Sequence, residues 1–193
     1  MPFSSGRPET LCGAGSMLEH TVSIRAWLPT LSRHLGIKSI LDAPCGDFNW
    51  MAHTDLSGID YIGVDFDPEH LARASETKSA GVSFAPKSKR LLELDIVNDR
   101  LPRADLMLCR EFLQHLPNDR VHKVLENFRD SGCEWFVATS HGNLFNTDIA
   151  AAGMFRPLNL KEIPFSLPVP HGYVGDEPGS DRILGLWHRS DFE

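Results

Sequence analysis

One short apolar segment of the chain runs into the turn sequence Leu41-Asp42-Ala43-Pro44-Cys45-Gly46-Asp47-Phe48. Residues 39–41 predict a buried strand, and the strand ends abruptly at Asp42. Gly46 has no side chain, so a ligand can approach the backbone of the turn. In an open α/β sheet, ligands bind beyond the carboxyl ends of the strands. We therefore predict a ligand-binding turn at the carboxyl edge of a parallel sheet.

The pattern on either side of this turn supports that fold class. Further apolar runs, each expected to form a strand, are found at 61–64, 91–94, 104–109 and 135–139. Helical patterns lie between them, one opening at Asp67-Pro68 and running to about Ser79, and one around 121–132. Continuous apolar strands separated by helices predict an α/β protein with a mostly parallel sheet covered on both faces.

The two ends of the chain have a different character. Residues 1–15 are rich in Gly, Pro and Ser, and Ser16-Met17-Leu18-Glu19 predicts a capping box that starts a helix ending at Gly36. Pro29 is expected to kink or divide that helix. Prolines punctuate the chain beyond Asn143, where only 182–187 predicts a strand. We expect one domain over 1–193, with an N-terminal cap (1–36), a cofactor-binding core (37–141) and an acceptor-side segment (142–193).

Composition excludes several classes of protein. The net charge of −7 argues against a protein that binds nucleic acid through general phosphate attraction. No apolar stretch is long enough to span a bilayer and no signal core is present, so we expect a cytoplasmic protein without a membrane partner. The four cysteines are widely separated, and the acids and histidines lack a ligand spacing, so we predict no metal site. The oligomeric state is left open.

Three acids end successive predicted strands. Asp42 suits an ammonium group rather than a pyrophosphate, because both the acid and the pyrophosphate are anionic. Asp65 follows 23 residues later, the spacing at which an acid accepts hydrogen bonds from ribose hydroxyls. Asp95 ends the third strand and is placed to accept from an adenine amino group. Ammonium, ribose and adenine together describe S-adenosylmethionine.

At these residues the chain resembles the class I S-adenosylmethionine-dependent methyltransferases, which have a Rossmann-like fold. The resemblance runs from about Ser16 to His141. It departs from the usual Asp/Glu-x-Gly-x-Gly-x-Gly motif at Pro44 and Phe48, which replace the first and last glycines. A variant subgroup that reads Asp-x-Pro-Cys-Gly is the closer resemblance.

The resemblance implies a set of cofactor-binding residues. The segment 109–116 is similar to the part of the family that lies beside the methionine moiety, so Cys109 and Arg110 are expected to approach the cofactor. Arg25 or Arg110 is expected to face the methionine carboxylate, although Arg25 equally fits a solvated helix position. The full expected set is Ser16, Arg25, Asp42, Ala43, Pro44, Cys45, Gly46, Asp65, Phe66, Asp95, Ile96, Cys109 and Arg110.

Methyl transfer to a hydroxyl group would use a base. The candidates are His115, His141 and Glu111, each placed after a predicted strand end. Glu111 and His115 lie four residues apart, so they could instead pair across a helical turn.

The leading prediction is methyl transfer to a small-molecule or sugar-like acceptor at oxygen. The nearest alternative acceptor is a protein or peptide side chain. A nicotinamide-dependent oxidoreductase is a rival, but it should carry Gly-x-Gly-x-x-Gly in the first turn. A cofactor-binding subunit without catalysis is the third reading.

Overall fold

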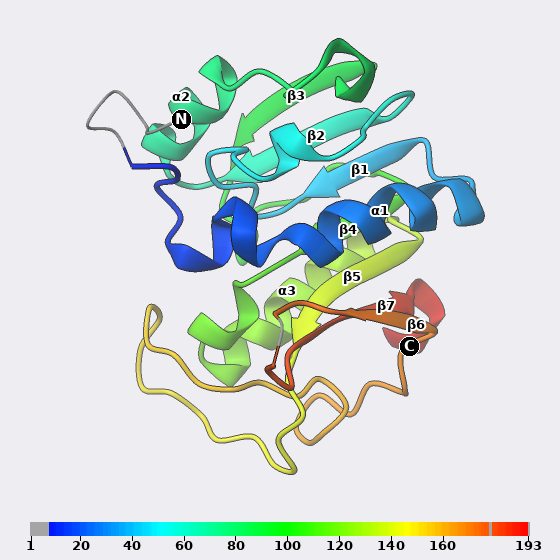
Figure 1. Ribbon diagram of the computed structural model, residues 1–193. Helices are drawn as coiled ribbons and strands as arrows, with labels where there is room; N and C mark the ends of the chain where they lie inside the picture. Colours follow the sequence, from blue (N-terminus) through cyan, green and yellow to red (C-terminus); the bar gives the residue numbers. More distant parts are fainter. Residues whose placement is uncertain (1–7, 178, 193) are drawn as a thin grey trace.

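The computed structural model, which describes residues 8–177 and 179–192, is built around one twisted sheet (Figure 1). Within these residues the strand order is β3-β2-β1-β4-β5-β7-β6. The strands are β1 (Ser39–Asp42), β2 (Asp60–Asp65), β3 (Ser88–Glu93), β4 (Leu106–Cys109), β5 (Trp135–Ser140), β6 (Gly172–Gly175) and β7 (Ile183–His188). This order is typical of a class I methyltransferase fold.

The first five strands are parallel, whereas β7 runs antiparallel to both β5 and β6. The parallel core predicted from the apolar runs is thus confirmed. Strand β6 was not predicted, because two of its four residues are glycines and it pairs only with β7. Parallel pairing brings the carboxyl ends of β1, β2 and β4 to one edge of the sheet.

Helices cover both faces of the sheet. Helix α1 (Val22–Leu35) lies in front of it in Figure 1, and α3 (Asn118–Ser131) lies behind. Helix α2 (Pro68–Glu76) packs against β2 and β3. Apolar residues at helical spacing fill the two cores, with Ile24 and Leu28 on one face and Val124 and Phe128 on the other. No helix in the described part of the chain is both long and apolar enough to cross a bilayer.

The start of α1 differs from the prediction. Ser16 lies in a 3-10 turn, and α1 begins at Val22 with no side-chain cap, so the predicted capping box is absent. The Leu18 amide instead donates to Glu9 across a separate turn (2.7 Å). Pro29 does not divide the helix, because the apolar face of α1 is buried against the sheet and one lost hydrogen bond does not end it.

The segment between β5 and β6 crosses the lower end of the molecule (Figure 1). Residues 141–171, all of which the structure describes, hold no helix or strand, as the prolines predict. The segment is nevertheless anchored, since Leu158, Leu160, Phe165 and Leu167 are buried in the core that α3 covers.

Candidate functional site

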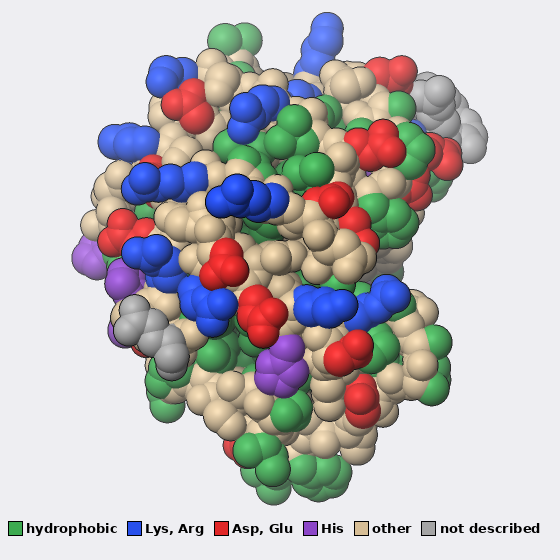
Figure 2. Space-filling view, turned by 180° about the vertical axis from the view of Figure 1, so that it is seen from behind, with side chains coloured by type: hydrophobic (Ala, Val, Ile, Leu, Met, Phe, Trp, Pro, Cys, Tyr) green, Lys and Arg blue, Asp and Glu red, His purple; other side chains and the backbone are tan. Residues whose placement is uncertain are grey.

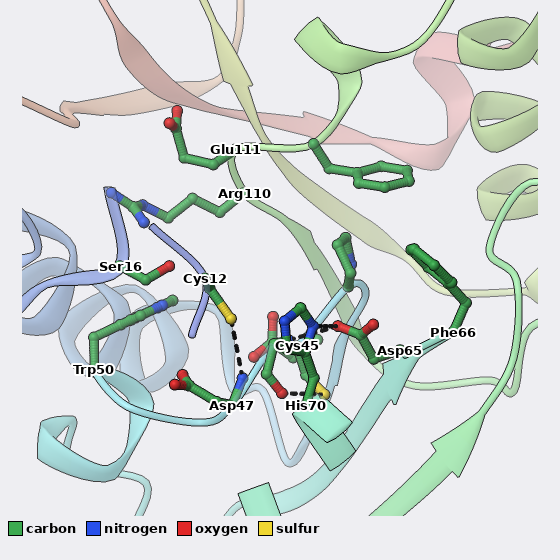
Figure 3. Close-up of a pocket in the computed structure, with 14 residues that line it drawn as sticks. Cys12, Ser16, Cys45, Asp47, Trp50, Asp65, Phe66, His70, Arg110 and Glu111 are labelled. Carbon is green, nitrogen blue, oxygen red and sulfur yellow. Dashed lines mark hydrogen bonds and ion pairs between the residues drawn. The ribbon is translucent and has the colours of Figure 1, made fainter. Parts of the chain in front are cut away.

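A cleft opens at the carboxyl edge of the sheet (Figure 3). Asp42 borders it from the end of β1, Asp65 from the end of β2, and Arg110 from the residue after β4. The lining residues are Cys12, Ser16, Asp42, Pro44, Cys45, Gly46, Asp47, Trp50, Asp65, Phe66, His70, Arg110, Glu111 and Phe112. The structure therefore brings the two strand-end acids to a single cavity.

The turn after β1 is held by the neighbouring strand. The Cys45 amide donates to the Val64 carbonyl (2.8 Å), and the Gly46 amide donates to Oδ2 of Asp65 (2.9 Å). Gly46 has a φ of 55°, and a Cβ there would lie 2.5 Å from Sγ of Cys12. A glycine is therefore required both by the backbone conformation and by the close approach of the N-terminal segment.

Phe48 stands where the usual family motif has its last glycine. It adopts a φ of 62°, in the left-handed region that glycine favours. Its buried ring packs edge-on against Tyr61, with centroids 5.0 Å apart. The backbone of the turn thus keeps a glycine-like conformation although the residue is a phenylalanine. The packing of the buried ring offsets the cost of that backbone conformation.

Asp42 is a buried carboxyl group with one side-chain partner. It is 3% exposed, and its Oδ2 accepts a hydrogen bond from the Tyr61 hydroxyl (2.7 Å). Burial raises the pKa of Asp42 to about 7, against the smaller opposing effect of that hydrogen bond. A cationic group entering the cleft would favour the ionised form.

Arg110 is the buried cationic side chain of the same cleft, opposite in charge to an ionised Asp42. Its side chain is 4% exposed; Nε donates to Asp176 (2.8 Å) and Nη1 donates to the Gly15 carbonyl (2.8 Å). The guanidinium lies over the Trp50 ring, 5.6 Å from its centroid. Nη2 has no hydrogen-bond partner anywhere in residues 8–177 or 179–192. A buried donor without a partner beside a cleft fits an anionic ligand group.

Glu111 lines the cleft, but its carboxylate is directed away from the cavity centre (Figure 3). Oε2 pairs with Arg182 (3.2 Å), which also pairs with Asp176 (3.1 Å). The alternative, a pair of Glu111 with His115, is not found in the described residues, because 113–115 is a single 3-10 turn and Nδ1 of His115 bonds the Met154 carbonyl.

The two candidate histidines lie beyond the cleft lining. His115 ends the 3-10 turn Leu113–His115, and His141 directly follows β5. Both rings contact Phe155, with centroids 5.8 Å and 6.1 Å from that ring. The structure thus gathers the two predicted bases around one aromatic side chain of the C-terminal segment.

Some predicted cofactor residues do not line the cleft. The side chain of Asp95 bonds the Val97 amide and Asn98, within its own loop. Arg25 donates to the Leu18 carbonyl (2.8 Å) and to Thr21. The others are Ala43, Ile96 and Cys109, which are buried in the apolar core.

Several lining residues had not been predicted to bind the cofactor. Asp47 follows the glycine of the turn, and its carboxylate accepts from the Leu11 amide (2.7 Å) and from Thr10 (3.1 Å). Its amide donates to Cys12 Sγ (3.3 Å). Burial raises the pKa of the Cys12 thiol to about 12, so this thiol is not a nucleophile at neutral pH. Residues 9–16, which we call the strap, thereby lie against the turn.

Two more unpredicted lining residues are His70 and Phe112. His70 lies 3.5 Å from Asp65 and one turn after Asp67 in the helix that follows β2. Phe112 belongs to the segment 109–116 and lines the same cavity as Phe66. Their positions after β2 and β4 are the only sequence signal that could have found them.

The cleft fits the cofactor that the strand-end acids suggest. A cation would stabilise the buried Asp42 carboxylate, and an anion would satisfy the unpartnered Nη2 of Arg110. Together these two groups complement the ammonium and carboxylate ends of an amino acid. Asp65 and the aromatic side chains of Phe66 and Phe112 line the same cavity and suit a nucleoside. Zwitterion and nucleoside together match S-adenosylmethionine.

Comparisons with known proteins agree with this reading. A family model described as a methyltransferase domain matches residues 41–131. No curated protein sequence matches the chain. The structure of magnesium protoporphyrin IX methyltransferase from Synechocystis with bound cofactor is similar, with a TM-score of 0.59 and 14% identity, over 84% of this chain and 75% of that one.

Two further solved structures are similar. The 1,6-didemethyltoxoflavin-N1-methyltransferase of Burkholderia thailandensis has a TM-score of 0.60 and 18% identity, covering 86% of this chain and 77% of that one. A possible exported protein from Bordetella parapertussis has a TM-score of 0.49 and 21% identity over 63% of this chain. The chain spans only 44% of the length of that protein.

The strand order and the cleft at its carboxyl edge define a class I methyltransferase fold. Residues 41–131 match a methyltransferase domain, and the similar structure from Synechocystis holds bound S-adenosylmethionine.

Proposed function

We propose that this domain transfers the methyl group to a small-molecule or sugar-like acceptor, at oxygen. The observation that carries the proposal is the pairing, in one cleft, of a buried carboxyl group and a buried guanidinium with an unsatisfied donor. We also propose that this chain belongs to the subgroup whose first motif reads Asp-x-Pro-Cys-Gly. In support, Pro44, Cys45 and Gly46 all line the cleft.

The residues around the cleft have separate tasks toward the cofactor. Asp42 binds the ammonium group and Arg110 the carboxylate of the methionine moiety. Asp65 accepts from the ribose hydroxyls, and Phe66 contacts the adenine. Bound there, the cofactor supplies an electrophilic methyl group on a sulfonium. The protein orients the acceptor against that group and excludes water.

A small acceptor is supported by the surface of the protein. On the face shown in Figure 2, Lys and Arg side chains are interspersed with Asp and Glu, so that face offers a polyanion no surface of a single charge sign. The names of two structural neighbours, the protoporphyrin and toxoflavin methyltransferases, specify small organic acceptors. Transfer to oxygen is supported by the two imidazoles gathered at Phe155, because a hydroxyl acceptor loses a proton on methylation.

The three parts of the chain divide the work in this proposal. Residues 1–36 cap the cofactor, 37–141 bind it, and 142–193 form the acceptor side. Asp176 and Arg182 in the last part pair with the Arg110 and Glu111 side chains, so ion pairs, of which Arg110–Asp176 is buried, connect the acceptor side to the cofactor cleft.

Methyl transfer can be measured with cofactor labelled in the methyl group. The protein is incubated with three acceptor panels, namely hydroxylated small molecules, small amines and thiols, and peptides. Label should appear in hydroxylated small molecules. Label in peptides alone would contradict the proposed acceptor class, and label in amines or thiols alone would contradict transfer to oxygen.

A further inference from the structure

Phe155 is an exposed aromatic side chain that contacts two imidazoles. It is 61% exposed, whereas large apolar side chains of this chain are mostly buried. Its ring centroid lies 5.8 Å from that of His115 and 6.1 Å from that of His141. The two histidines follow β4 and β5, at the carboxyl edge of the sheet where the cofactor cleft also lies. The charge of Glu111, which borders the cleft, acts on the pKa of His141.

The exposure of Phe155 does not come from a loosely held loop. The next residue, Arg156, is buried and donates from Nη1 to the Leu116 carbonyl (2.7 Å) and from Nη2 to Asn118 (2.6 Å). Its backbone amide donates to the Gln114 carbonyl (3.2 Å), and the Gly153 amide donates to the His115 carbonyl (2.9 Å). The aromatic ring is thus presented by a fixed backbone beside the His115 turn.

Figure 2 shows apolar side chains gathered at the lower end of the molecule, where this segment lies. The segment contributes the exposed residues Leu144, Phe145, Met154, Phe155 and Ile163. Of these, Phe155 is the one that contacts both imidazoles, which separates it from a general apolar surface.

The neighbouring backbone sets opposite hydrogen-bonding roles for the two imidazoles. Nδ1 of His115 lies 3.2 Å from the Met154 carbonyl, which can only accept. Nδ1 of neutral His115 therefore carries the proton, and Nε2 keeps a free lone pair.

His141 has the other tautomer. The Leu158 amide donates to its Nδ1 (3.1 Å), so Nε2 carries the proton when the ring is neutral. The Leu158 carbonyl also lies 3.3 Å from Nδ1, a longer contact than that of the Leu158 amide, so the amide hydrogen bond favours the proton on Nε2. Burial lowers the pKa of His141, which favours the neutral ring; the backbone hydrogen bond with Leu158 and the charges of Glu111 and Asp181 oppose this shift, and Arg182 assists it.

We propose that Phe155, His115 and His141 form the acceptor subsite, and that the acceptor is a planar aromatic or heteroaromatic small molecule bearing a hydroxyl group. Phe155 stacks against the acceptor ring. Nε2 of His115 accepts the hydroxyl proton, and Nε2–H of His141 donates to the acceptor oxygen or to a neighbouring substituent. The inference rests on the proposed function and names the acceptor class for the same site.

The reaction at this subsite balances without a further reactant. The acceptor oxygen forms a bond to the methyl carbon as the carbon–sulfur bond breaks, and that electron pair stays on sulfur. The hydroxyl proton passes to Nε2 of His115, and the resulting imidazolium releases it to solvent. A phenol is only weakly acidic, with a pKa of about 10, so a base is useful at neutral pH.

The stacking role is tested by binding rather than by turnover. 1-Naphthol is titrated into protein saturated with S-adenosylhomocysteine, and the aromatic signal is followed by NMR. Phe155→Ala should weaken naphthol binding about tenfold. Phe145→Ala is the matched control, because Phe145 is 71% exposed in the same segment and should leave the affinity unchanged. Equal naphthol affinity in both variants would overturn the subsite.

The role of His115 as the base is tested with a variant that keeps the hydrogen bond to the Met154 carbonyl. In His115→Asn the side-chain amide can still donate to the Met154 carbonyl, but the Nε2 lone pair is lost. Methylation of naphthol should fall by about 100-fold or more at unchanged affinity for S-adenosylhomocysteine. Methylation of a nitrophenol that is already ionised at the assay pH should fall much less. Equal losses for both acceptors would show that His115 does not take the proton.

The outcomes distinguish a failure of the cofactor site from a failure of the aromatic acceptor. Failure of S-adenosylhomocysteine to bind the wild-type protein would contradict the cofactor site itself. Cofactor binding with methylation of aliphatic hydroxyls, sugars or amines but not of phenols would leave methyl transfer standing and overturn the aromatic acceptor.

Discussion

The Asp65 carboxylate accepts a hydrogen bond from the Gly46 amide over 2.9 Å, and its other oxygen accepts from the Asp67 amide over 2.9 Å. The end of β2 is thereby joined to the turn after β1 before any ligand is present. This arrangement fixes one carboxylate beside the cavity without consuming all of its acceptor positions, because each carboxylate oxygen has two lone pairs.

Asp42 makes the stability of the protein depend on pH. Its pKa is about 7 in the folded state and near 3.8 when unfolded, so the native state binds more protons between these values. The free energy of unfolding should therefore decrease as pH rises from about 4 to about 7. Asp42→Asn keeps an acceptor for the Tyr61 hydroxyl and should remove this loss, gaining up to about 4 kcal/mol at pH 8.

Urea unfolding of both proteins at pH 5 and pH 8 measures the effect. The difference between the two pH values should be smaller in Asp42→Asn than in the wild type. The same dependence on pH in both proteins would show that Asp42 ionises normally despite its burial.

Arg110 is expected to bind the carboxylate of the methionine moiety. Arg110→Lys keeps a positive charge beside Asp176 but loses the guanidinium that presents Nη2 to the cleft. Affinity for S-adenosylhomocysteine should fall about tenfold, the equivalent of about 1.4 kcal/mol for a lost charged hydrogen bond. Affinity for 5′-methylthioadenosine, which lacks the amino acid, should stay unchanged. A parallel loss for both ligands would indicate a structural defect instead.

Asp47 should control how firmly the strap lies on the cleft. Asp47→Asn weakens the hydrogen bonds that this side chain accepts from the Thr10 hydroxyl and the Leu11 amide. Amide hydrogen exchange in residues 9–16 should become faster, and S-adenosylhomocysteine should dissociate several times faster. Asp55→Asn is the control, because Asp55 also accepts from a backbone amide, that of Ser57, but in an exposed turn. Unchanged exchange in the strap of Asp47→Asn would refute its role as the anchor.

Much of the fold could be predicted from the sequence because buried parallel strands are short apolar runs. Val64 and Met107 lie in such runs, and both are completely buried. The edge strand β6 could not be found this way, since Tyr173 is exposed and the strand begins and ends with glycine. The cap predicted at Ser16 failed because the local motif is satisfied by other turns, among them one closed by Glu9.

The site was partly predictable for a related reason. Asp42 and Asp65 end parallel strands, and strand ends of one direction meet at one edge, so their proximity follows from topology. Contacts that join residues far apart in the chain include that of Cys12 with Gly46, the ion pair of Arg110 with Asp176 and the contacts of Phe155 with two histidines. No local pattern encodes such contacts, and the structure was needed to find them.

The most direct measurement is calorimetric titration of S-adenosylhomocysteine into the wild type, Asp65→Ala and Asp60→Ala. Asp60 is the matched control, an aspartate at the other end of β2 that pairs with Lys87 on the surface. We expect one binding site, an affinity loss of about 1–3 kcal/mol for Asp65→Ala, and no change for Asp60→Ala. Undiminished binding to Asp65→Ala, or no binding to the wild type, would contradict the assignment of this cleft to the cofactor.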